Sequence, residues 1–257
     1  MSVYDVMDGF QPDVALVKYD AMSRDLIKYL IQAKPVPTFI DITGATAHIV
    51  GMIEQQIAQL NMPVKGFISE TPKTLRNFET KIPTADIMPG ADVFLGKSDV
   101  PNFKLDGAVV GRIQTKTFDD CCSRFKTYHK VLVRDQKGQG NREGFDIEGS
   151  VMFLKSVYDK YKEIVLNGDL SFVLSQLFFD ATISSEKVSL SYPKEQQQLF
   201  SNSLESIFED TGEEPSLKGI KSQILENHTC IDRCSEILKY LGDTEASETV
   251  LKLKEGL

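Results

Sequence analysis

The sequence predicts an α/β protein: a small mixed sheet flanked by helices, followed by a mainly helical second domain. In residues 1–145, short apolar runs bounded by Gly and Pro alternate with stretches of helical periodicity. Beyond residue 145 nearly every apolar pattern has helical spacing. A chain of 257 residues with 41% hydrophobic content is long enough to bury such a core. We therefore expect an α/β domain over residues 1–145 and an acidic helical domain over residues 146–257.

The first domain is expected to open with a helix over residues 13–34, because its apolar residues have near-helical spacing and Pro35 and Pro37 follow. A turn over residues 43–46 should lead into a second helix that ends at residues 61–63. Residues 72–81 should form a short helix or loop, and a third helix should run from Phe118 to Leu132. Strands are expected at residues 39–42, 64–69, 91–95 and 108–117.

The second domain is expected to follow a linker or mobile loop at residues 138–144. One strand is expected at residues 187–192. Helices are expected at residues 151–166, 170–179, 194–208, 217–241 and 245–253. Their apolar residues would form either core or a groove or dimer contact, namely Leu199, Leu204, Ile207, Phe208, Leu217, Ile220 and Ile224.

Charge is distributed unevenly along the chain. The net charge of -8 argues against a protein that coats nucleic acid indiscriminately, because such binding depends on Lys and Arg neutralising phosphates. Residues 103–144 nevertheless carry nine basic against five acidic side chains, whereas residues 195–257 carry thirteen acidic against six basic. Any anion-binding surface is therefore expected in the middle of the chain.

The cysteines and the apolar segments indicate a compartment. The adjacent pair Cys121 and Cys122 and the spaced pair Cys230 and Cys234 form neither a disulfide framework nor the paired spacing of a structural zinc site, so we expect reduced thiols. A metal site at Cys230 and Cys234 with the nearby His228 is a minor alternative. No apolar run is long enough to span a membrane, and the N-terminus lacks a secretory pattern, which together predict a cytoplasmic protein.

The run from Val109 to Thr117 contains the residues most suited to chemistry. On a strand, Gln114 and Lys116 would leave the same face of the sheet, so an oxygen ligand and a lysine would serve one site. Hydrolysis of a phosphodiester needs a divalent metal with oxygen ligands and a cation near the charged transition state. Glu54 on a preceding helix and Asp92 on a preceding strand would complete such a set.

This order of residues resembles the PD-(D/E)xK, or restriction-endonuclease-like, superfamily over about a third of the chain, residues 43–133. The resemblance implies that Asp92, Gln114 and Glu54 hold Mg²⁺ and that Lys116 is catalytic, with Asp106 as an alternative first ligand. Gln114 departs from the usual acid, although a Gln-x-Lys variant exists in the superfamily. The implied activity is metal-dependent cleavage of nucleic acid, or binding of nucleic acid on a nuclease-like fold. Basic residues near the site would contact the phosphates: Arg112, Arg124, Lys126, Lys130 and Arg134.

Three other interpretations remain open. Gln114 and Lys116 would also suit the solvent face of an ordinary strand. A protein without enzymatic activity would use the C-terminal helices to bind a protein partner or a second copy of itself. The turn Thr43-Gly44 before a helix would suit a small-molecule or nucleotide sensor, although it lacks the glycine-rich fingerprints of nucleotide sites. The scattered His48, His129 and His228 indicate no catalytic triad.

Overall fold

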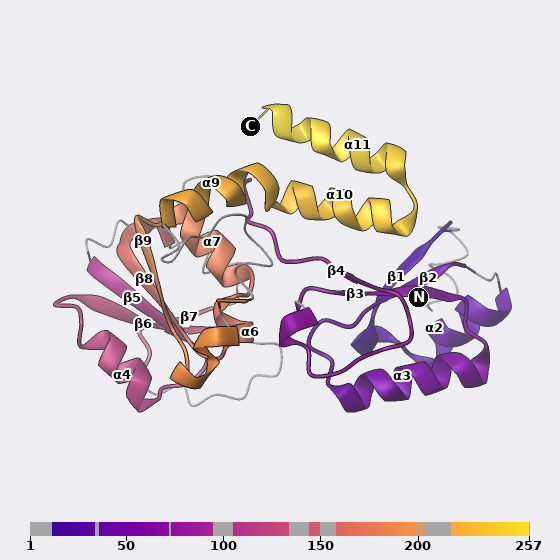
Figure 1. The fold of residues 1–257 in the computed structure, drawn as a ribbon, viewed down its shortest axis with the longest axis horizontal. Coiled ribbons are helices and arrows are strands. Elements are labelled where there is room, and N and C mark those ends of the chain that lie inside the picture. The colour runs from indigo at the N-terminus through magenta and orange to yellow at the C-terminus, as the bar shows by residue number, and fades with distance from the viewer. Residues whose placement is uncertain are drawn as a thin grey trace. The chain divides into compact units, whose positions relative to one another are not determined.

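The computed structural model divides the chain into two compact units. Unit 1 comprises Met1–Met88 together with Cys234–Leu257, and unit 2 comprises Pro89–Arg233. Both contain a sheet and helices, so the expected α/β class is confirmed (Figure 1). The structure describes residues 12–33, 36–71, 73–94, 105–133, 144–149, 158–199, 201–202 and 217–256.

Unit 1 is built on a parallel sheet with the strand order β1-β2-β3-β4. Its strands are β1 (Ala15–Lys18), β2 (Thr38–Asp41), β3 (Val64–Ser69) and β4 (Thr84–Asp86). The expected mixed sheet differs from this arrangement, because every pairing among these strands is parallel. The expected strands at residues 39–42 and 64–69 are confirmed as β2 and β3.

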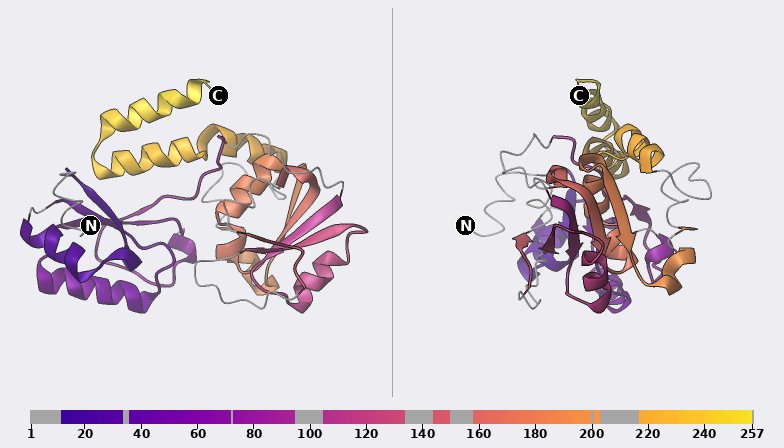
Figure 2. Two further views of the ribbon diagram at one scale, coloured as in Figure 1. Left: turned by 180° about the vertical axis from the view of Figure 1, so that it is seen from behind. Right: turned by 90° about the vertical axis from the view of Figure 1, so that its left-hand side faces the viewer.

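Helices from opposite ends of the chain cover the two faces of the unit 1 sheet (Figures 1 and 2). On one face lie α2 (Arg24–Lys28), the π-helical turn Tyr29–Ala33 and α3 (Ala47–Leu60). On the other face lies α10 (Cys230–Leu241), followed by α11 (Thr244–Lys252). The rings of Tyr240 and Phe39 pack edge-on with their centroids 5.2 Å apart, and the Tyr240 hydroxyl donates to the carbonyl of Pro83 at 3.0 Å.

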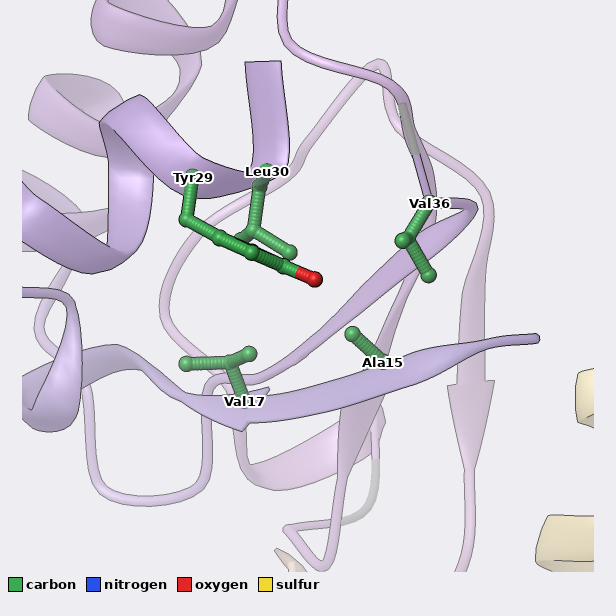
Figure 3. Close-up of a cluster of buried hydrophobic side chains, with 5 residues drawn as sticks. All are labelled: Ala15, Val17, Tyr29, Leu30 and Val36. Carbon is green, nitrogen blue, oxygen red and sulfur yellow. The ribbon is translucent and has the colours of Figure 1, made fainter. Parts of the chain in front are cut away.

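The helix expected over residues 13–34 is wrong in its first third. Residues 15–18 form β1, where Ala15 and Val17 are buried while Leu16 and Lys18 are exposed, the alternation of a strand with one covered face. Figure 3 shows Ala15 and Val17 packed beneath Tyr29, Leu30 and Val36. The strand and the following helix contribute residues to one hydrophobic cluster, so their apolar positions together resemble the spacing of a single helix. In apolar segments this short, periodicity alone does not distinguish a strand from a helix.

Unit 2 is built on a second parallel sheet, with the strand order β7-β6-β5-β8-β9. The central strands are β5 (Leu105–Gly111) and β8 (Tyr161–Asn167). The flanking strands are β6 (Tyr128–Val133), β7 (Ile147–Gly149) and β9 (Lys187–Ser191). The domain boundary expected at residues 145 and 146 falls inside this sheet.

The helices of unit 2 follow its strands. α4 (Lys116–Cys122) connects β5 to β6 and packs Phe118, Cys121 and Cys122 on Val109 and Val165 of the sheet. α6 (Leu170–Val173) and α7 (Gln176–Ser184) connect β8 to β9, and α9 (Leu217–Asn227) contacts α7. Because these connections run in opposite directions along the sheet, α4 and α7 cover opposite faces (Figures 1 and 2).

Two predicted helices of unit 2 are wrong. The helix from Phe118 to Leu132 stops at Cys122, and its second half is β6; the helix over residues 151–166 contains the central strand β8. Ile164, Val165 and Leu166 are all fully buried, since a central parallel strand is covered on both faces and loses the alternation that marks exposed strands.

Several other predictions divide into three groups. Confirmed are the helix after Thr46, the strand at 187–192 as β9 and the helix at 245–253 as α11. The helix at 217–241 is broken into α9 and α10 at His228-Thr229, and the strand at 91–95 reduces in its described part to a single bridge from Ala91 to Thr229. The linker residues 138–143 and the apolar residues Leu204, Ile207 and Phe208 lie outside the described residues. No helix within the described ranges is long and apolar enough to cross a membrane.

Candidate functional site at the carboxyl edge of the unit 2 sheet

The order of strands in unit 2 creates a point where two neighbouring strands send the chain in opposite directions. From the end of β5 the chain passes to β6 on one side, and from the end of β8 it passes to β9 on the other. In open parallel sheets such a divergence leaves a crevice outside the carboxyl ends of the strands, which is where ligands characteristically bind. The residues just after Gly111 and Asn167 therefore define the candidate site.

Arg112 extends over this divergence. It follows the last residue of β5, and its guanidinium carbon lies 5.1 Å from the ring centroid of Phe172 in α6, after β8. Phe172 is buried, whereas Arg112 is exposed. A cation over an aromatic face is held in place without using its N–H donors. Arg112 forms no hydrogen bond or ion pair with any residue that the structure describes.

The end of β8 forms the floor beside Arg112. Asn167 is buried and its side-chain amide donates to Ser191 Oγ at 2.9 Å, while the backbone N–H of Gly168 donates to the Ser191 carbonyl at 3.0 Å. A Cβ on Gly168 would lie 2.5 Å from the Phe172 ring, so only glycine lets the ring sit there. Asp169 caps α6 by accepting the Phe172 N–H at 2.9 Å. These contacts fix the ring that supports Arg112.

Polar side chains continue from Arg112 towards β6. The Gln114 amide donates to Asp119 Oδ1 at 2.8 Å, and Lys130 Nζ on β6 lies 3.2 Å from the same oxygen. The hydrogen bond from Gln114, followed by the bond and charge of Lys130, lowers the pKa of the Asp119 carboxyl. A Cβ on Gly144 would lie 2.9 Å from Gln114 Oε1, so that glycine permits the close approach. Gln114 and Lys130 thus share the Asp119 carboxylate as their hydrogen-bond acceptor.

The structure does not place Gln114 and Lys116 side by side on a strand. β5 ends at Gly111, Gln114 lies in the following loop, and Lys116 is the first residue of α4 after the N-cap Thr115. Thr115 accepts the N–H of Phe118 at 3.1 Å, which starts the helix. The two side chains therefore lose the shared sheet face on which the predicted chemistry depended.

The other predicted metal ligands have separate local partners. Glu54 lies in unit 1, where its Oε1 accepts bonds from the Thr80 hydroxyl and the Lys81 N–H. Asp92 lies in unit 2 and accepts the N–H of Phe94 at 3.0 Å. The alternative ligand Asp106, in β5, accepts the Thr127 hydroxyl at 3.1 Å, at the opposite end of the strand from Gln114.

The residues that the structure describes contain no group of three or more His, Cys, Asp or Glu side chains able to hold a metal ion. This finding covers the alternative at His228, Cys230 and Cys234. The expected Mg²⁺ set contains only two side chains of these types, Glu54 and Asp92, beside Gln114. A requirement for Mg²⁺ therefore stays a prediction.

The basic residues predicted to contact nucleic acid do not form one surface. Arg124 pairs with Glu163 at 2.9 Å near the amino ends of the strands, while Lys130 pairs with Asp119. Lys126 is exposed in the turn before β6, and Arg134 lies outside the described residues. Of the members of this set that the structure describes, Arg112 alone stands at the divergence of β5 and β8. The helix that would have aligned Lys126, Lys130 and Arg134 is absent, because residues 128–133 are a strand.

The turn after β2 in unit 1 is formed by its own hydrogen bonds. Asp41 Oδ1 accepts the Thr43 N–H at 2.8 Å, and Thr43 Oγ1 accepts the Glu70 N–H at 2.9 Å. Glu70 is exposed as a residue, yet desolvation of its carboxyl raises its pKa; Asp41 adds to the rise and Lys18 opposes it. Thr43 therefore joins β2 to β3, the role of a structural turn. The sensor interpretation at Thr43-Gly44 stays a prediction.

Sequence reasoning missed Asn167, Gly168 and Phe172. The signal was present, because Asn167-Gly168-Asp169 after an apolar run has the composition of a strand end followed by a helix cap. It was overlooked because the preceding run was assigned to a helix.

Comparison with known proteins gives solved structures only. No protein-family model matches the chain, and no curated protein sequence matches it. The solved structures include the spinosyn rhamnosyltransferase SpnG complexed with thymidine diphosphate, at 12% identity and a TM-score of 0.38, covering 98% of this chain and 71% of that one. The calicheamicin glycosyltransferase CalG4 matches at 11% identity and TM-score 0.35, covering 98% and 74%. SnogD from Streptomyces nogalater, a glycosyltransferase, matches at 11% and 0.36, covering 98% and 70%.

The predicted membership of the PD-(D/E)xK superfamily is wrong, and with it nuclease and hydrolase activity. The three named structures are glycosyltransferases. At these identities and TM-scores they assign no activity to this chain. The geometry gives the physical reason for the correction: the sheet is parallel, and the Gln114-Thr115-Lys116 run is a loop and a helix start instead of a strand.

Proposed function

We propose that unit 2 binds a small anionic ligand, of the phosphate-bearing class, at the carboxyl edge of its sheet. The observation that carries this proposal is the position of Arg112, held over the Phe172 ring where β5 and β8 diverge. A guanidinium presents a planar set of donors that matches phosphate and carboxylate oxygens. Among the described residues none occupies these donors, which leaves them for a ligand.

The surroundings of Arg112 support a small ligand. Gly111 ends β5 and Gly168 follows the last residue of β8. A Cβ on Gly168 would lie 2.5 Å from the Phe172 ring, and one on Gly111 would lie 3.0 Å from the Phe118 ring, so the backbone is closely packed at both positions. Exposed Ile113 supplies apolar surface beside the cation, with 58% of the residue accessible. A site with one cation, close backbone and a small apolar surface suits a compact anion better than a long polymer.

The experiment measures binding of inorganic pyrophosphate and of ADP and UDP to the full chain by isothermal titration calorimetry. We expect at least one of the three to bind, and Arg112→Ala to weaken that binding about tenfold or more, as loss of a charge-assisted hydrogen bond does. Arg124→Ala is the matched control, since Arg124 also lies over a phenylalanine ring, at 6.0 Å, near the other end of the strands.

Two results would contradict the proposal. One is the absence of binding by all three probes at millimolar concentration. The other is an equal loss of affinity in Arg112→Ala and Arg124→Ala, because that result would indicate a general charge effect instead of a site. Arg124→Ala is expected to fold, since Glu163 keeps its bonds to Lys187 and Ser189.

Two further expectations from the sequence are carried as proposals. The cytoplasm remains our proposed compartment because Cys121 and Cys122 are buried unpaired thiols, which suit a reducing environment. Partner binding, whether of nucleic acid, of a protein or of a second copy through the C-terminal helices, is tested by no observation above and stays a prediction.

A further inference from the structure

The chain passes between the units twice, and the unit 2 segments at the ends of the two connections are neighbours. It enters unit 2 at Pro89 and leaves after Arg233. The first segment after entry, Gly90–Asp92, pairs with the turn before α10: Ala91 N–H donates to the His228 carbonyl at 2.8 Å, and Cys230 N–H donates to the Ala91 carbonyl at 2.7 Å. The entry and exit segments are therefore hydrogen-bonded to each other within unit 2.

Two side chains of α7 hold the other side of the same segment. The Gln176 amide donates to the Gly90 carbonyl at 2.6 Å, and Asp180 Oδ1 accepts the Asp92 N–H at 3.0 Å. Gln176 and Asp180 are one helical turn apart and bond to each other at 2.9 Å. The backbone groups of Gly90 and Asp92 thus point to α7, while those of Ala91 point to the exit segment, which is the alternation of a central strand.

The burial of this arrangement shows that it excludes water. Ala91 and Asp180 have no exposed surface. A Cβ on Gly90 would lie 2.3 Å from the Thr229 carbonyl oxygen, so the segments approach as closely as backbone allows. Desolvation of a carboxyl group in such a place is unfavourable unless the group is hydrogen-bonded, as it is here to Gln176 and Asp92.

We infer that Gln176 and Asp180 form a clamp that fixes the entry segment directly and the exit segment through Ala91. The hydrogen bonds that hold the two segments in unit 2 therefore break and re-form together. The physical reason is that Ala91 cannot keep its pairing with His228 and Cys230 if Gly90 and Asp92 leave α7. This inference is independent of the proposed ligand site. Asp180 is a positioning residue in it, since it acts on the exit segment only through residues 90–92.

The test is amide hydrogen exchange, read by NMR on the full chain. Asp180→Ala should raise the exchange rates of the Ala91, Asp92 and Cys230 amides together, by about tenfold or more, the cost of one unsatisfied buried donor. Cys230 is the decisive amide, because it bonds to Ala91 and not to Asp180. The matched control is Thr182→Ala in the same helix, which removes a buried hydroxyl bonded to the Phe178 carbonyl and should leave the three amides unchanged.

Coupling of this kind must be reciprocal. Asp232 accepts the backbone and side-chain donors of Thr229 at 2.8 and 2.7 Å, so Asp232→Ala should loosen the exit segment and speed exchange of the Asp92 amide. If Asp180→Ala does not fold, Gln176→Ala serves in its place, since it removes only the bond to Gly90 and the support of Asp180. Exchange that rises at Ala91 and Asp92 but not at Cys230, or at none of the three, would overturn the clamp.

Discussion

Glu163, on the amino-terminal half of the unit 2 sheet, accepts hydrogen bonds from two cationic side chains and one hydroxyl. Its carboxylate accepts bonds from Arg124, Lys187 and Ser189 at 2.9, 2.8 and 2.7 Å. Burial by itself raises its pKa, but the bonds from Lys187 and Ser189 and the charges of Lys187 and Arg124 outweigh burial and lower it. This residue joins β8 to β9 and to the segment after α4.

Because its folded pKa lies below its unfolded one, Glu163 contributes stability that is present above the unfolded value, 4.5, and is lost as the pH falls through the folded value. We expect Glu163→Gln to lower the free energy of unfolding at pH 7 by about 1–2 kcal/mol, since its partners Arg124 and Lys187 are half-exposed. Urea unfolding at pH 7 and pH 3.5 measures this. A difference between wild type and variant that is as large at pH 3.5 as at pH 7 would contradict the assignment.

In the candidate site, the spacing of single residues predicted the wrong arrangement of side chains. Spacing alone placed Gln114 and Lys116 on one face because it assumed that the strand continued to Thr117. The strand stops at Gly111, and Thr115 begins a helix by capping Phe118. The cap was readable from the sequence, since Thr115 precedes a first turn that contains Asp119. The position of Arg112 over Phe172 was not readable, because it depends on the pairing of β5 with β8.

A helix or strand was predictable where the residues at its ends are typical of such ends. α3 begins at the N-cap Thr46 and ends at Asn61, whose φ of 49° is the left-handed conformation of a helix end, and both residues are typical of those positions. β8 has no such signal within it. Its consecutive buried residues are compatible with a core helix, and only its neighbours β5 and β9 make it a strand.

The strand β1 gives a direct test at the scale of one element. In a strand, neighbouring residues face opposite sides, so Leu16→Ser should change the free energy of unfolding by less than about 0.5 kcal/mol, while Val17→Ser should lower it by about 2 kcal/mol or more. Leu16 is 44% exposed, whereas Val17 is 9% exposed and packs on Tyr29. Urea unfolding of the two variants measures both values. Equal destabilisation by the two would indicate that residues 15–18 are not a strand with one buried face.

At the scale of the molecule, unit 1 is assembled from both ends of the chain. Residues 234–257 belong with residues 1–88, although unit 2 separates them in sequence. Tyr240 joins the two parts of the chain, since its ring packs edge-on against Phe39 of β2 and its hydroxyl donates to the Pro83 carbonyl. No local pattern in the acidic C-terminal helices reveals that their partner lies about 200 residues earlier, which is why the sequence suggested a separate helical domain.

Removing the Tyr240 side chain should therefore affect unit 1 and leave unit 2 intact. Tyr240→Ala leaves Phe39 without its edge-on partner and the Pro83 carbonyl without its donor, and we expect about 2–3 kcal/mol less stability in unit 1. Hydrogen exchange should accelerate in β2 and β3, while β5 and β8 keep their protection. Tyr240→Phe keeps the ring and should cost only about 1 kcal/mol. Faster exchange in β5 and β8 to the same extent as in β2 and β3 would show that the two units unfold as one, contrary to the division of the chain between them.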